Sequence, residues 1–280
     1  MKIYYQGNPG SYMNIASKEI SKNLNIEIDE IIGLPEFRDV WENISKDGIG
    51  VLAIENSYMG SIHPNIYGFL KYDFQIIGEY YLEINHCICS LETDIKNIKE
   101  VYSQMPALEQ CHFYLKNKNI IPKEFSDTAL SAKYISEKGL KGVGAICSEV
   151  AAKLYGLNII EKNISDQKGN TTRFVVIVPK ESNIKYNNKS NKISIIFESR
   201  DIPASLYKCL GSFATNNVNL KKIESLPSYK GSFTYYFWLE FEGKINDENI
   251  KKSLEELSFF TKNIRILGKY KINFFIKIKN

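Results

Sequence analysis

Hydrophobic and polar residues alternate along the first 180 residues with the periods of strands and helices in turn. The strands predicted from β-branched and aromatic runs are residues 2–6, 26–32, 50–54, 75–90, 100–103, 120–125, 143–146, 157–160 and 174–178. The helices predicted from apolar residues at helical spacing, and from caps, are residues 12–20, 35–45, 106–117, 127–137 and 147–155. This alternation is typical of an α/β domain.

The last third of the chain follows a different order. Residues 181–191 are polar, rich in Asn and without a period, which predicts a linker. After it come a strand, a helix, two strands, a helix and a strand, at residues 192–199, 203–216, 220–227, 232–241, 247–260 and 264–271. The order βαββαβ predicts a ferredoxin-like domain over residues 192–271, followed by a tail at 272–280.

Composition narrows the functional classes. The chain of 280 residues is too long for one small core, and 44% hydrophobic with 24% charged residues is a globular composition. A net charge of +4 is too weak and too dispersed to indicate nucleic-acid binding, whereas a small anionic substrate fits it. The N-terminus does not resemble a signal peptide, and no apolar run is long enough to span a bilayer.

Cysteine and histidine usage bears on location and on metals. Five scattered cysteines indicate reduced thiols and a cytoplasmic protein. With three histidines and no HExxH or CxxC motif, a catalytic metal is not expected.

Residues 170–174 (NTTRF) stand at the entrance of the strand with the clearest apolar run. Alternation along a regular strand places Thr172 and Phe174 on one face and Arg173 on the other. Taken alone, the stretch fits a threonine at a strand entry and an arginine paired with a surface carboxylate. Other motifs in the chain favour a functional role.

Several segments, in order, resemble monofunctional prephenate dehydratases that carry a C-terminal ACT domain. They are residues 7–12 (GNPGSY), 50–61 (GVLAIENSYMGS), 103–111 (SQMPALEQC), 127–129 (DTA), 145–157 and 163–174. The last contains TRF and is the most specific of them. Met13, Ala53, Met59 and the loop at 104–106 depart from the family's pattern.

The resemblance implies a fold and a reaction. The fold is a catalytic domain of two α/β lobes, of periplasmic-binding-protein type, at residues 1–180. One lobe is formed by about 1–74 with 161–180 and the other by 75–160, with the active site between them. The reaction is the loss of carbon dioxide and water from prephenate to give phenylpyruvate in phenylalanine biosynthesis, with no cofactor.

Roles for individual residues follow from the matched motifs. Thr172 is the candidate donor to the departing hydroxyl, acting by position more than by a matched pKa. Asn56, Ser103 and Gln110 offer neutral donors, and Glu55 positions its neighbours. Substrate binding is assigned to Arg173, Phe174, Ser11, Ser57 and Thr128. Singly, most of these have ordinary structural explanations, such as an Asx turn at Asn56 or a helix cap at Ser11.

The C-terminal domain resembles the phenylalanine-binding ACT domains of this family in residues 201–206 (DIPASL) and 219–227 (NLKKIESLP). By this resemblance the phenylalanine site includes Ala204, Ser205, Leu206, Asn219, Leu220, Glu224 and Ser225. Ala204 replaces a glycine and Leu226 an arginine, so the pocket could be narrower. A domain that only forms a homodimer or homotetramer is the structural alternative.

Two rival functions remain open from the sequence. An arogenate dehydratase would use the same mechanism on a substrate with an amino group in place of the keto oxygen. A non-catalytic amino-acid-binding sensor would share the two-lobed fold, but it would have no need of Thr172.

Overall fold

The computed structural model describes the chain except for residues 25, 46, 183, 185–189, 229–234 and 272–280. It divides into two compact units: the first contains Met1–Ile66 and Tyr80–Phe174, and the second contains Tyr67–Glu79 and Val175–Phe274. Parts of the predicted linker and the predicted tail lie outside the described residues. The predicted domain boundaries therefore stay a prediction.

The first lobe of the first unit is built on parallel strands. Strand β1 (Lys2–Gln6) pairs with β2 (Glu30–Leu34) on one side and β3 (Gly48–Asn56) on the other. Helices α1 (Tyr12–Asn23) and α2 (Phe37–Asn43) pack against β1. Strand β3 is buried along nearly its whole length, as expected for a parallel strand covered on both faces. It ends at Asn56, beside the short strand β4 (Gly60–Ser61).

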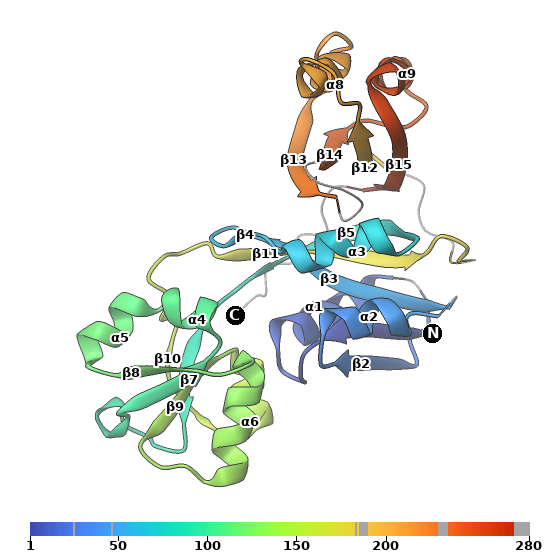
Figure 1. Ribbon diagram of the computed structural model, residues 1–280. Helices are drawn as coiled ribbons and strands as arrows, with labels where there is room; N and C mark the ends of the chain where they lie inside the picture. The colour runs from blue at the N-terminus through green and yellow to red at the C-terminus, as the bar shows by residue number, and fades with distance from the viewer. Residues whose placement is uncertain (25, 46, 183, 185–189, 229–234, 272–280) are drawn as a thin grey trace. The chain divides into compact units, whose positions relative to one another are not determined.

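The second lobe of this unit has a mixed sheet of five strands in the order β10-β6-β9-β7-β8 (Figure 1). The strands are β6 (Cys87–Ser90), β7 (Glu100–Ser103), β8 (Ile121–Glu124), β9 (Val143–Cys147) and β10 (Asn158–Lys162). The helices are α4 (Met105–Glu109), α5 (His112–Lys118), α6 (Thr128–Lys138) and α7 (Glu149–Leu154), with a 3-10 turn at Ile95–Asn97. Two apolar clusters form its core, one of them around Ile135 and Cys147 and the other around Val101 and Leu108.

Three elements belong to both units because the chain passes between the units within them. They are α3 (His63–Lys71), β5 (Phe74–Glu83) and β11 (Thr171–Pro179). The site residues of β11, Thr172 to Phe174, lie in the first unit.

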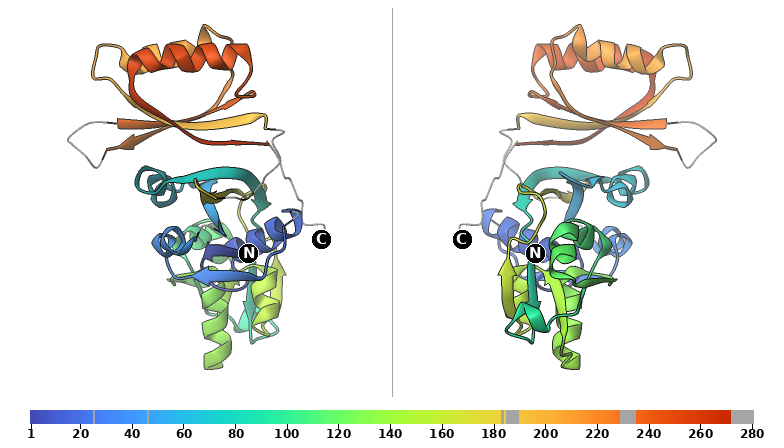
Figure 2. Two further views of the ribbon diagram at one scale, coloured as in Figure 1. Left: turned by 90° about the vertical axis from the view of Figure 1, so that its right-hand side faces the viewer. Right: turned by 90° about the vertical axis from the view of Figure 1, so that its left-hand side faces the viewer.

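The second unit contains the predicted βαββαβ order. Strand β12 (Lys192–Ser199) is central, between β14 (Tyr235–Glu242) and β15 (Thr261–Tyr270), and β13 (Leu220–Pro227) pairs with β14; these pairings are all antiparallel. Helices α8 (Ser205–Ala214) and α9 (Glu248–Phe260) lie side by side on one face of the sheet (Figure 2). Their buried residues, including Phe213 and Leu257, join Phe197 and Phe241 in one core.

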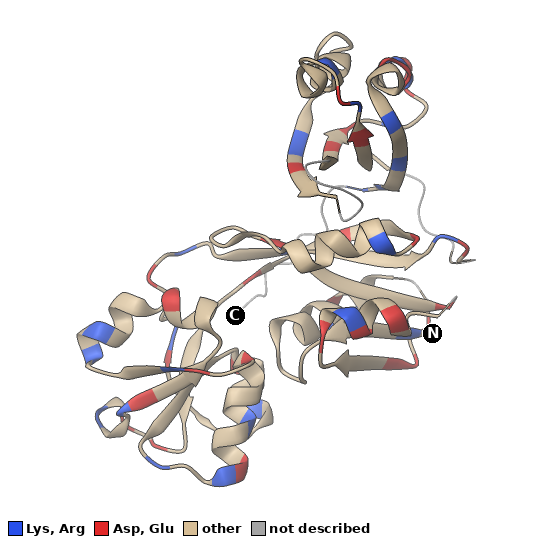
Figure 3. Cartoon of the chain, in the orientation of Figure 1, with Lys and Arg blue, Asp and Glu red and all other residues tan. Residues whose placement is uncertain are grey.

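Charged residues of both signs are interspersed along the elements of both units (Figure 3). Lys192, on β12, is buried between Glu79 and Glu240, and its Nζ lies 2.9 and 3.0 Å from their carboxylates. This buried ion pair network belongs to the second unit.

Some predicted elements differ from the structure. The helix predicted at 106–117 is two helices, α4 and α5, separated at Gln110 and Cys111. The long strand predicted at 75–90 is the two strands β5 and β6, and helix α3 was not predicted. The sequence also predicts Ser126 as the cap of the helix at 127–137 and Pro35 in the first turn of the helix at 35–45. In the structure Asp127 caps α6, and Pro35 precedes α2.

Ala204, the N-cap of α8, is held in the left-handed region with φ 59° and ψ 26°. That conformation costs a residue with a Cβ about 1–2 kcal/mol, whereas glycine loses about 0.4–1 kcal/mol through its more flexible unfolded chain. We therefore expect Ala204→Gly to raise the free energy of unfolding by up to about 1 kcal/mol, measured by denaturant titration. Lys208→Gly, within α8, is the control and should lower it by about 1 kcal/mol. Equal losses in both variants would contradict the expectation.

Candidate functional site

A cavity of about 470 Å³ lies between the two lobes of the first unit. Both lobes supply its walls. The predicted site residues that line it are Ser11, Asn56, Gln110, Thr128, Thr172 and Phe174. Tyr12, His86 and Asp127 also line it, and none of these three was predicted as a site residue.

Strand β11 alternates as the sequence predicts. Thr172 and Phe174 line the cavity, while Arg173 is not among the lining residues. Arg173 is 5% exposed, and its Nη1 lies 3.4 Å from Oε2 of Glu55. The pair thus joins β11 to β3, and in this structure neither Arg173 nor Glu55 faces the cavity. This arrangement does not support the predicted contact of Arg173 with a substrate carboxylate.

Asn56 holds Thr172 through a defined set of hydrogen bonds. Its Oδ1 accepts from the backbone N–H groups of Tyr58 and Met59, at 3.0 and 3.1 Å. Its Nδ2 donates to Oδ1 of Asn170 at 2.7 Å and to Oγ1 of Thr172 at 2.9 Å. Both amide hydrogens are therefore directed to protein atoms in this structure, and the predicted role of Asn56 as a substrate donor stays a prediction. Because Thr172 accepts this bond, its own hydroxyl hydrogen is available to another acceptor.

The hydrogen bonds continue from Asn170 across the cavity wall. Asn170 Nδ2 donates to Gln110 Oε1 at 2.8 Å, and His86 Nε2 lies 3.0 Å from the same oxygen. Gln110 is the C-cap of α4, at the helix break that the sequence did not predict. These hydrogen bonds link residues whose separation in the sequence ranges from 24 to 116 positions.

The predicted serines and threonine have distinct surroundings. Ser103 is fully buried, donates to the carbonyl of Ile146 at 2.7 Å and is not among the residues lining the cavity, so it supports the sheet rather than the site. Ser57 accepts from the backbone N–H of Thr171 at 3.0 Å. Ser11 caps α1 and Thr128 is the first residue of α6, and both line the cavity.

Two helices begin at the cavity. Ser11 caps α1, of 12 residues, and Asp127 caps α6, of 11 residues. The N-termini of helices favour anions. Burial raises the pKa of the Asp127 carboxyl, and hydrogen bonds from the backbone of Leu130 and Ala129 oppose that shift. None of the described residues that line the cavity is Lys or Arg.

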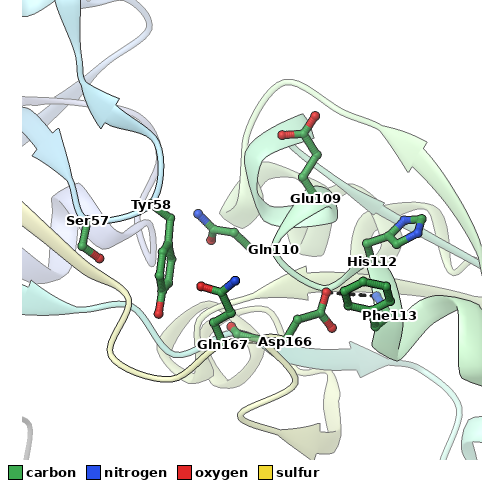
Figure 4. Close-up of a pocket in the computed structure, with 9 residues that line it drawn as sticks. Ser57, Tyr58, Glu109, Gln110, His112, Phe113, Asp166 and Gln167 are labelled. Carbon is green, nitrogen blue, oxygen red and sulfur yellow. Dashed lines mark hydrogen bonds between the residues drawn. The ribbon is translucent and has the colours of Figure 1, made fainter.

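A second cavity, of about 630 Å³, is also lined by Gln110 (Figure 4). Figure 4 shows Gln110 between Tyr58 and Glu109, with Asp166 near Phe113. The Asp166 carboxylate accepts from the backbone N–H groups of Phe113 and Tyr114, so it caps α5. We place the site in the smaller cavity because that cavity contains Thr172.

His86 is 2% exposed, and burial lowers the pKa of its imidazole from 6.5 to about 4, against a hydrogen bond with Gln110 that raises the pKa. Between pH 6.5 and 4 the unfolded chain binds a proton at this residue and the folded chain does not. The free energy of unfolding should therefore fall as the pH falls through this range, by about 3 kcal/mol from His86. The free energy of unfolding of His86→Gln, measured as a function of pH, should not show this decrease. A variant with the wild-type slope between pH 6.5 and 4 would contradict the assignment.

The predicted phenylalanine-binding residues lie at two places in the second unit. Ala204, Ser205 and Leu206 stand at the start of α8, whereas Leu220, Glu224 and Ser225 belong to β13, which Asn219 precedes. Leu226, at the position of the family's arginine, is fully buried. The Ser205 hydroxyl is buried, near the thiol of Cys209.

No described helix is long and apolar enough to cross a membrane. The described residues include no group of three or more His, Cys, Asp or Glu arranged to hold a metal ion. The five cysteines are buried and free.

Comparison with known proteins identifies the family. The sequence model of the family described as Prephenate dehydratase matches residues 3–182. The chain belongs to the prephenate dehydratase family. This membership confirms the resemblance to prephenate dehydratases and the predicted enzyme class, a carbon–oxygen lyase. The family match covers residues 3–182, so the resemblance of the C-terminal domain to an ACT domain stays a prediction.

Relatives and solved structures agree with the assignment. The chain is 39% identical over 236 residues to the prephenate dehydratase of Methanocaldococcus jannaschii, covering 84% of this chain and 85% of that one. It is 34% identical over 285 residues to "Arogenate dehydratase/prephenate dehydratase 2, chloroplastic" of Arabidopsis thaliana, covering 98% and 73%. The structure of the prephenate dehydratase of Staphylococcus aureus matches with a TM-score of 0.83 and 27% identity, over 97% and 100% of the two chains. The predicted α/β fold class is confirmed.

Proposed function

We propose that this member of the prephenate dehydratase family converts prephenate to phenylpyruvate, with Thr172 as the donor to the departing ring hydroxyl. One observation carries the assignment of Thr172. Its Oγ1 accepts a hydrogen bond from Asn56 Nδ2 at 2.9 Å inside the cavity, which leaves its proton for a substrate oxygen. A hydroxyl held in this way acts by position in a desolvated site.

The reaction balances with one proton taken from solvent. The ring carboxylate leaves as carbon dioxide, and the electron pair of the broken C–C bond enters the ring. The C–O bond to the ring hydroxyl breaks at the same time, and the oxygen departs as water once it has gained a proton. Thr172 donates its hydroxyl proton to the departing oxygen and then takes up a proton from water. The ring becomes aromatic, which supplies the driving force.

Two helix N-termini at the cavity favour the carboxylates of the substrate, and the one acidic residue of the described lining, Asp127, accepts hydrogen bonds from the backbone of Ala129 and Leu130. The N-termini of α1 and α6 attract anions, while the described lining contains neither Lys nor Arg. Neutral donors and helix ends bind a carboxylate without an ion pair, so the loss of its charge as carbon dioxide is less opposed. Gln110 Oε1 is already an acceptor for Asn170, so its Nε2 is the atom that can donate to a ligand.

Arogenate is the second candidate substrate because the Arabidopsis relative is named for both activities. Asp127, which lines the cavity, is the group that would interact favourably with the ammonium of arogenate. Parallel assays of phenylpyruvate formation from prephenate and phenylalanine formation from arogenate test both proposals. Tight binding of an amino acid without turnover of either substrate would instead favour the sensor.

We further propose that phenylalanine regulates the enzyme through the second unit, in a cytoplasmic homodimer or homotetramer. The βαββαβ order and the matched segments at α8 and β13 support this. Feedback requires phenylalanine to favour one state of the catalytic unit over another. Turnover of prephenate measured with saturating phenylalanine tests it, and unchanged kinetics would leave only a role in assembly.

A further inference from the structure

His86 is a buried, polar group of the cavity wall that the proposed reaction does not use. It lies between β5 and β6, and its two ring nitrogens contact different lobes of the first unit. Nε2 lies 3.0 Å from Gln110 Oε1, and Nδ1 lies 3.0 Å from the hydroxyl of Tyr12. The rings of Tyr12 and His86 meet edge to face, with centroids 5.4 Å apart.

Two backbone N–H groups determine the donor and acceptor of each hydrogen bond that links Asn56, Asn170, Gln110 and His86. Asn56 Oδ1 accepts from two backbone N–H groups, so the other end of that amide must donate. Its Nδ2 therefore donates to Asn170 Oδ1, and Asn170 Nδ2 in turn donates to Gln110 Oε1. Because that oxygen can only accept, His86 Nε2 must carry a hydrogen.

We propose that His86, as the neutral imidazole protonated at Nε2, is a positioning residue that holds Gln110 in one orientation, with its Nε2 turned to the ligand. This role rests on the proposed function, since Gln110 is its link to substrate. Without the donor at His86, the Gln110 amide is held by one hydrogen bond, from Asn170, instead of two.

The other ring nitrogen agrees with this tautomer. Nδ1 is then an acceptor, and the Tyr12 hydroxyl can donate to it or to the carbonyl of Asn85, 2.9 Å away. Burial raises the pKa of that hydroxyl well above its usual value, so it keeps its proton. Burial also lowers the pKa of His86, in keeping with a neutral ring.

The first experiment reads the tautomer without any substrate. The ¹⁵N shifts of the three histidines in the intact chain, with His86 assigned through the signals lost in His86→Gln, report which nitrogen is protonated. We expect the Nε2–H form near pH 7. An Nδ1–H form, or an imidazolium, would overturn the proposal whether or not the chain acts on prephenate.

The second experiment separates positioning from packing. His86→Gln keeps a donor near the position of Nε2, whereas His86→Leu keeps only the apolar volume. We expect His86→Leu to lose about 10- to 100-fold in kcat/KM and His86→Gln to recover most of it, with both folded by thermal melting. Equal losses in the two folded variants would overturn the role. The same comparison on the exposed His112, by His112→Gln and His112→Leu, is the control and should show no difference.

If wild-type enzyme turns over neither prephenate nor arogenate, the proposed function fails while the tautomer measurement still decides the state of His86. In that case the binding of phenylpyruvate, measured by calorimetry, replaces turnover. His86→Leu should then bind it about tenfold or more weakly than His86→Gln. Equal affinities would overturn the positioning role.

Discussion

Replacing Thr172 by alanine should lower kcat on prephenate by about two to four orders of magnitude, the range that general acid catalysis supplies. The side chain is 8% exposed and small, so the change leaves little empty volume. It does leave one hydrogen of Asn56 without its acceptor, which should cost about 1–3 kcal/mol of stability. The measurement is steady-state turnover, together with a thermal melt that shows the variant is folded.

Two further variants separate the effect of the Thr172 hydroxyl from that of the shape of the side chain. Thr172→Ser keeps the hydroxyl and should retain much of the activity, whereas Thr172→Val keeps the shape and should resemble alanine. Near wild-type kcat in Thr172→Ala or Thr172→Val would remove Thr172 from the reaction. Loss in all three, including serine, would indicate that shape rather than the hydroxyl matters.

Local sequence patterns predicted much of the fold. The bounds of β1, β7, β12 and β13 coincide with the predicted strands, because each is a short stretch with β-branched or aromatic residues between polar or turn-forming segments. Helix α3 was missed because Pro64 and Gly68 obscure its period. The break between α4 and α5 was missed because the apolar face continues through Cys111, which is buried.

Side-chain orientation in the site was predictable where it follows from the two-residue period of a strand. It was not predictable where it depends on contacts with residues distant in the sequence. Alternation along β11 correctly separated Thr172 and Phe174 from Arg173. The pairing of Arg173 with Glu55 joins residues 118 positions apart, and no local pattern in the sequence indicates it. His86 is a single histidine in a β-rich run, so its contacts with Tyr12 and Gln110 become visible only in the folded chain.

Asn56→Asp should lower kcat by about two orders of magnitude or more, even though it keeps the shape of the side chain. A carboxylate can still accept from the backbone N–H groups of Tyr58 and Met59, so the turn after β3 is retained. It cannot donate to Thr172 Oγ1, so the Thr172 hydroxyl turns to donate to the carboxylate. Its proton is then directed away from the substrate.

A double-mutant cycle tests whether Asn56 acts through Thr172. If it does, Asn56→Asp should cost little further activity in the Thr172→Ala background, because the hydroxyl that it redirects is already absent. Additive losses would mean that Asn56 contributes to turnover by a separate route, either through Asn170 and Gln110 or by direct contact with substrate. Neither Asn56 amide hydrogen is directed to a ligand, and the bond to Asn170 reaches the substrate only through Gln110, so most of the loss should be non-additive.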